Sequence, residues 1–95
     1  MQIDNNPIEL LVNALPHHDV VISKDVNDKF MVSYAHADIS DPPMRVGSVG
    51  RGDTVRKAAL DYIHQISGKK LIFGEGPKRE EVTVAILQTE RFVGY

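Results

Sequence analysis

Gly-Arg-Gly-Asp-Thr-Val-Arg-Lys-Ala-Ala-Leu-Asp-Tyr-Ile-His-Gln-Ile-Ser-Gly, residues 50–68, is the stretch of this sequence that most constrains its fold. Asp53 or Thr54 can cap the start of a helix, and Gly68 can end it in the left-handed conformation. Apolar residues recur at helical spacing on one face, namely Val55, Ala58, Ala59, Tyr62, Ile63 and Ile66. The stretch therefore predicts one amphipathic helix over residues 54–67.

Towards the N-terminus, the motif Asn6-Pro7-Ile8-Glu9 predicts the start of an earlier helix. Asn6 can cap this helix, Pro7 suits its first turn, and Glu9 completes a capping-box-like pair. Pro16 ends the helix, because its ring removes a backbone hydrogen bond from a continuing helical turn.

Three strands are predicted between the two helices, over residues 19–23, 30–37 and 44–49. A polar turn over residues 24–29 makes the first two a hairpin, and Pro42-Pro43 lies in a loop over residues 38–43. After the second helix, residues 71–73 and 81–87 predict a second hairpin, and residues 88–95 form a tail without pattern.

The predicted order α-β-β-β-α-β-β indicates a single α+β domain with an antiparallel sheet and both helices on one face. A chain of 95 residues suffices for one compact domain. The opposite face of the sheet is either solvated or a dimer surface.

Composition excludes several classes of protein. The absence of cysteine excludes disulfides and thiolate metal sites, and fits a reducing cytoplasm. No apolar run approaches the roughly 20 residues that span a bilayer. Residues 1–6 lack the basic and apolar regions of a signal peptide. We therefore expect a cytoplasmic protein.

Charge is divided unevenly along the chain. Residues 1–44 carry seven acids and two bases, whereas residues 45–95 carry nine bases and six acids. The basic half can meet an acidic partner such as nucleic acid, although the alternative is a scatter of solvated charge.

Basic residues gather where the second helix begins. Free N–H groups at a helix N-terminus attract anions. Lysine and arginine at that end are unfavourable for the helix dipole, and their presence there favours a binding site for phosphate or carboxylate. The alternative is an exposed helix end compensated by Asp53. The candidate anion-binding and nucleic-acid-binding residues are Arg45, Arg51, Arg56, Lys57, Lys78 and Arg79.

Residues 5–68 resemble the double-stranded RNA-binding domain. The shared features are a Gly-x-Gly turn, a following threonine and a basic helix start, carried by Gly50, Gly52, Thr54, Arg56 and the small Ala58. The resemblance implies recognition of RNA by shape. Val55 and Ala59 depart from it, because that family usually has lysines there.

Two other resemblances concern the same region. Residues 50–67 are similar to the helix of HicB-like antitoxins, in which Gly-Asp-Thr starts the helix after a β-hairpin. The helix and the basic hairpin after it, over residues 50–87, look like small phage and prophage proteins of Gram-positive bacteria. That likeness brings no assigned activity.

No catalytic or cofactor-binding constellation is visible. His17, His18, His36 and Asp38 lack the spacing of metal ligands, and no serine has a supporting base. We therefore expect a protein that is not an enzyme and that has no cofactor or metal.

Both faces of the predicted strand over residues 81–87 are mostly apolar. The strand either completes the sheet within one monomer or pairs with a second copy as a homodimer. The sequence thus predicts a small non-enzymatic binding protein with weak affinity for nucleic acid. The alternative is an inhibitor, adaptor or antitoxin-like module that binds a protein through its acidic half or this edge.

Overall fold

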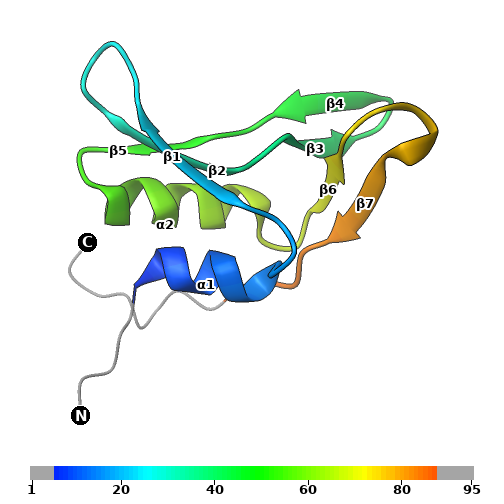
Figure 1. The fold of residues 1–95 in the computed structure, drawn as a ribbon, viewed down its shortest axis with the longest axis horizontal. Coiled ribbons are helices and arrows are strands. Elements are labelled where there is room, and N and C mark those ends of the chain that lie inside the picture. The colour runs from blue at the N-terminus through cyan, green and yellow to red at the C-terminus, as the bar shows by residue number, and fades with distance from the viewer. Residues whose placement is uncertain (1–5, 88–95) are drawn as a thin grey trace.

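A computed structural model describes residues 6–87 of the chain (Figure 1). It is an α+β fold with antiparallel sheets, as predicted. The predicted tail over residues 88–95 lies outside the described residues. The elements in order are α1 (Pro7–Ala14), β1 (Val20–Lys24), β2 (Phe30–Tyr34), β3 (Ala37–Asp41), β4 (Met44–Gly47), β5 (Gly50–Gly52), α2 (Val55–Ile66), β6 (Lys70–Phe73), a short 3-10 helix (Gly76–Lys78) and β7 (Glu80–Thr83).

The strands form two sheets, with the orders β1-β2-β5 and β4-β3-β6-β7. β2 and β3 follow one another in one direction and form an outgoing arm. β4 and β5 run back beside them and form a returning arm, in which β4 pairs with β3 and β5 pairs with β2. Between the pairs Val32–Gly50 and Asp38–Gly47, the outgoing arm has five residues and the returning arm has two. The extra residues bulge at His36, whose φ of 60° is left-handed.

The observed strands differ from the predicted ones in four main respects. The strand predicted over residues 30–37 breaks near His36, and residues 38–41 of the predicted loop continue the arm as β3. Only the cis-linked Pro42-Pro43 remains as a turn. The predicted glycine-rich turn at residues 50–52 is strand β5, and the single predicted sheet is divided into two.

The C-terminal hairpin is confirmed as the antiparallel pair β6–β7. However, the strand predicted over residues 81–87 ends at Thr83. The following residues run beside the end of α2, where the Leu87 N–H donates to the Ser67 hydroxyl over 2.7 Å. Val84 is buried in the core.

Both helices begin and end close to where the sequence predicts. Asn6 Oδ1 accepts from the Ile8 N–H over 2.9 Å, and Thr54, rather than Asp53, accepts from the Lys57 N–H over 3.1 Å. Gly68 follows α2 with a φ of 74°. Among residues 6–87, neither helix is long and apolar enough to cross a membrane.

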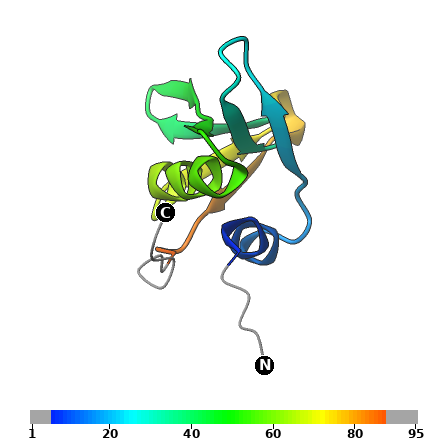
Figure 2. The ribbon, with the colours of Figure 1, turned by 90° about the vertical axis from the view of Figure 1, so that its left-hand side faces the viewer.

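The main core forms where α2 packs against β5 and β2, with α1 packed against α2 (Figure 2). Two glycines of β5 face the helix backbone. A Cβ atom on Gly50 would lie 2.1 Å from the carbonyl oxygen of Ala58, and one on Gly52 would lie 2.7 Å from the Ala58 nitrogen. These glycines therefore allow a contact that a side chain would prevent. The core side chains are Leu11, Val32, Tyr34, Ala58, Ala59, Leu60, Tyr62, Ile63, Ile66, Leu71, Phe73 and Val84.

Two buried tyrosines connect the helices to β2. The Tyr34 hydroxyl donates to the Leu11 carbonyl over 2.6 Å, and the Tyr34 N–H donates to the Tyr62 hydroxyl over 3.2 Å. Their rings meet edge to face at 5.8 Å. Burial raises the pKa of both hydroxyls above the ordinary value of 10.0.

Replacing Gly50→Ala is expected to lower the free energy of unfolding by about 3 kcal/mol, because the new methyl group overlaps the α2 backbone. Gly47→Ala is the matched control, since its Cβ would come no closer than 3.8 Å to any neighbour. Its effect should be less than about 0.5 kcal/mol. Urea denaturation measures both, and equal effects would contradict this account of the packing.

Alkaline pH is expected to destabilise the protein through the two tyrosines. Their raised pKa means that the unfolded chain releases these protons first, so the stabilisation is complete below pH 10 and is lost above it. Urea midpoints across this range should fall less steeply with pH in Tyr34→Phe, which has one ionisable hydroxyl fewer. An unchanged slope would show that Tyr34 does not contribute.

Candidate functional site

The six predicted basic residues form two groups at opposite ends of the described fold (Figure 1). Arg51, Arg56 and Lys57 lie together at the start of α2. Arg45 lies on β4, and Lys78 and Arg79 lie in the turn between β6 and β7. The structure therefore separates the first three residues from the other three, and of the first three, Arg51 and Lys57 line one groove whereas Arg56 does not.

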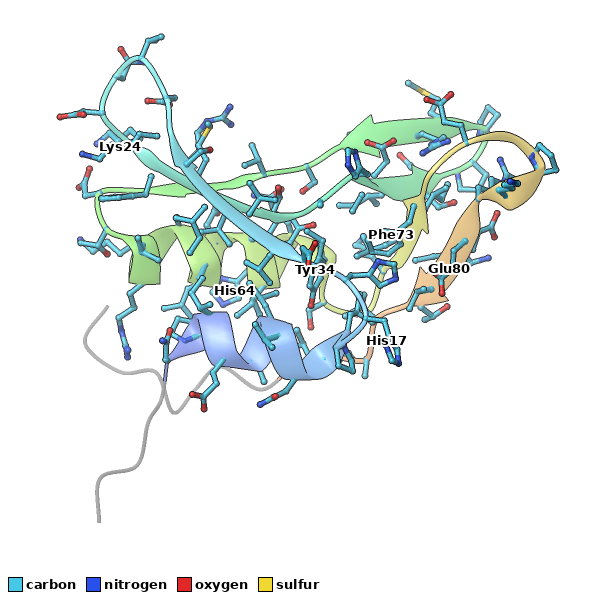
Figure 3. All side chains as sticks on the ribbon, in the orientation of Figure 1. His17, Lys24, Tyr34, His64, Phe73 and Glu80 are labelled. Atoms are coloured by element: carbon cyan, nitrogen blue, oxygen red, sulfur yellow. The ribbon has the colours of Figure 1, made fainter. Side chains whose placement is uncertain are left out.

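A groove of about 590 Å³ runs beside the start of α2. Its walls come from the β1–β2 turn, the end of β5 and the exposed face of α2, on which His64 is labelled in Figure 3. The lining residues are Lys29, Arg51, Gly52, Asp53, Lys57, Asp61 and His64. Positive and negative side chains are mixed in this groove.

Most charges around the groove are already matched within the protein. The Lys29 ammonium is hydrogen-bonded to the Asp53 carboxylate, and this contact raises the pKa of Lys29 and lowers that of Asp53. Arg51 Nε lies 3.7 Å from Asp25 Oδ2. The Lys29–Asp53 pair is exposed, and Asp25 of the other pair is partly buried. Surface ion pairs contribute little to stability, but both pairs reduce the net positive charge offered to an anion.

Two polar side chains of α2 bind the outer backbone of the returning arm. Asp61 Oδ2 accepts from the Arg51 N–H over 3.0 Å. The Gln65 side-chain amide donates to the Val49 carbonyl and to Asp61, each over 3.0 Å. These bonds satisfy backbone groups that an edge strand would leave open, so Asp61 has a structural role.

Two residues of the distant basic group, Arg45 and Arg79, also have partners within the protein. The Arg45 guanidinium donates to Asp38 Oδ2 over 2.9 Å and to the Gly74 carbonyl over 3.0 Å, which ties β4 to β3 and to the turn after β6. Arg79 lies 3.2 Å from Glu81. Arg45 is therefore a structural residue, which its sequence context did not indicate.

Of the histidines considered as metal ligands, His18 has a packing role. Its ring stacks on Phe73 at 3.7 Å, and Nε2 lies 3.0 Å from Glu80 Oε1. Figure 3 labels Phe73 and Glu80 at this end of the fold, near His17. Within residues 6–87, no three His, Asp or Glu side chains are grouped to hold a metal ion.

Sequence reasoning missed the apolar edge of the three-stranded sheet. It selected residues 81–87, but β7 is four residues long and carries the exposed acids Glu80 and Glu81. The strand β1, at the edge of the other sheet, exposes 43% of Val21 and 47% of Ile22. The run Val20-Val21-Ile22 was the available signal, but the sequence does not show which strand lies at an edge.

Comparisons with protein-family models, with curated proteins and with solved structures found no match for this chain. The resemblances to the RNA-binding domain, to HicB-like antitoxins and to phage proteins therefore stay predictions. A proposal of function must rest on the groove and on the edge of β1.

Lys29→Gln is expected to raise the pKa of Asp53 towards its ordinary value of 3.8, because the lysine is the main cause of the lowering. Arg51→Gln is the matched control, since its guanidinium lies beside Asp25 instead. Carboxyl-carbon NMR titration would measure both variants. A pKa of Asp53 that stays low without Lys29 would contradict the pairing.

Proposed function

We propose that this chain is a non-enzymatic binding protein whose ligand is another protein. The observation that carries the proposal is the open apolar edge of β1, where Val21 and Ile22 are each nearly half exposed. Exposed strand edges with apolar side chains readily recruit another chain. The cytoplasmic setting expected from the lack of cysteine belongs to the same proposal.

The charge arrangement supports a protein ligand over nucleic acid. Binding to a phosphate backbone depends on cations that replace counterions. Here Arg45, Arg51 and Arg79 each have an acidic partner within the protein. Phosphate would have to compete with these carboxylates for the guanidinium groups.

Nucleic acid is the second candidate, favoured by one specific observation. Arg51 and Lys57 line the same groove as Lys29 and His64, and Lys57 lies in the first turn of α2, at the positive end of the helix dipole. Phosphates lying along this groove would meet four basic side chains, two of which would first leave Asp25 and Asp53.

Fluorescence anisotropy with labelled double-stranded RNA, double-stranded DNA and single-stranded DNA separates the two candidates. We expect no saturable binding tighter than about 100 μM at physiological salt, because the groove has little free positive charge. The test compares the wild type with Arg51→Glu plus Lys57→Glu, and with Lys69→Glu as a control outside the groove.

Binding that weakens steeply with salt and disappears only in the double variant would overturn the protein-ligand proposal. It would assign nucleic acid to the groove instead. Binding that Lys69→Glu weakens equally would indicate diffuse attraction without a site, which leaves the proposal standing.

A further inference from the structure

The backbone of β1 has a hydrogen-bonding side that no described strand occupies. The Asp19 carbonyl accepts from the Ala35 N–H over 2.9 Å, and the Asp25 N–H donates to the Lys29 carbonyl over 3.0 Å. Both bonds fit the register of β1 with β2. Since such bonds alternate along an antiparallel pair, the N–H and C=O groups of Val20, Ile22 and Lys24 point away from β2.

The other edge strands are shorter than the five residues of β1. The edge strand β4 exposes 63% of Met44 and 41% of Val46, but it has four residues and carries the charged Arg45. Gln65 and Asp61 bind the outer backbone of the returning arm at Val49 and Arg51. The edge strand β7 is short and acidic. Along β1, Lys24 is the one charged side chain, and Val21 and Ile22 stand exposed on opposite faces of the sheet. Natural edges usually carry stronger protection than this.

A second copy of the chain fits this edge poorly. A strand of five residues is about 17 Å long, which is short for the roughly 1,200 Å² of a stable interface. Antiparallel self-pairing centred on Ile22 would set Asp19 opposite Asp25 of the copy. Pairing centred on Val21 would set Lys24 opposite His18 of the copy. The register that pairs the whole of β1 with itself, centred on Ile22, therefore brings like charges together.

The charges at the ends of β1 indicate a different occupant. Asp19 is exposed just before the strand, and Asp25 and Asp28 follow it. The Lys24 ammonium is already 3.5 Å from Asp28 Oδ1 and lies over the Phe30 ring. Asp25 Oδ1 accepts from the Asn27 and Lys29 N–H groups, and Asp25 Oδ2 lies 3.7 Å from Arg51 Nε. The exposed carboxylate that this edge offers to a strand laid along it is therefore that of Asp19.

We propose that β1 accepts an extended segment of a partner protein as a fourth strand of the β1-β2-β5 sheet. The segment has a β-branched apolar centre that covers Val21 and Ile22, and a lysine or arginine at the end that faces Asp19. Its backbone bonds to Val20, Ile22 and Lys24, in the mode of strand addition. This inference rests on the proposed function and names the partner chemistry of that site.

The probe is the synthetic peptide acetyl-Lys-Thr-Val-Thr-Val-Thr-Lys-amide, and its control has glutamate at both ends. Titration into the isotopically labelled full chain is followed by amide NMR shifts. We expect saturating shifts confined to β1 and its neighbours, largest at Val20, Ile22 and Lys24. At low salt the glutamate peptide should bind about fivefold more weakly.

Variants test the position and the charge. Ile22→Lys should abolish the shifts, whereas Val12→Lys, at a residue of similar exposure (44%) on α1, should leave them unchanged. Asp19→Lys should reduce or reverse the preference for the lysine peptide. The amide spectrum of each variant also reports whether it has folded.

Absence of shifts in β1 at about 1 mM peptide would overturn strand addition while leaving the proposed protein ligand intact. Equal binding of the two peptides would overturn the charge assignment. If sedimentation shows a dimer of the wild type and a monomer of Ile22→Lys, the strand that pairs with β1 is a second copy of this chain, and the proposed partner segment is wrong. The proposed function is tested separately by the anisotropy experiment, in which nucleic-acid binding that depends on Arg51 and Lys57 would contradict it.

Discussion

The close approach of α2 to β5 is the contact on which the rest of the fold depends. It exists because Gly50 and Gly52 have no side chains, so the helix backbone at Ala58 can touch the strand. At this distance Tyr62 reaches the β2 backbone, while Asp61 and Gln65 reach the edge of the returning arm. One pair of glycines therefore places the core and also closes one edge of the sheet.

The same contact changes the meaning of the charged residues around it. Gly-x-Gly before a helix is typical of backbone that approaches a phosphate, but here the group that approaches is the helix itself. The nearby Arg51 and Lys29 meet the carboxylates of Asp25 and Asp53. An anion that binds Arg51 or Lys29 in the groove would therefore have to displace a carboxylate of the protein.

An asymmetry between the sheet edges follows from this packing. Side chains of α2 cover part of the edge formed by the returning arm, and the edge strand β7 carries two acidic residues. In contrast, β1 has exposed apolar side chains on both faces of its sheet. Because α1 packs mainly on α2 and only slightly on β1, it leaves the outer side of β1 open. The apolar edge of β1 lies on a strand that leads into the β1–β2 turn, which forms one wall of the groove.

Local signals in the sequence determined both helices, their caps, the first hairpin and the antiparallel α+β class, because Asn6, Thr54 and the apolar periodicity act within a few residues. Tertiary structure alone decided the bulge at His36, the division into two sheets and the pairing of β3 with β6. It also decided that Arg45 would bind Asp38 and that β1 would remain an edge. These features depend on contacts between distant residues, and a local pattern carries no information about which distant group will neutralise a charge or cover a strand.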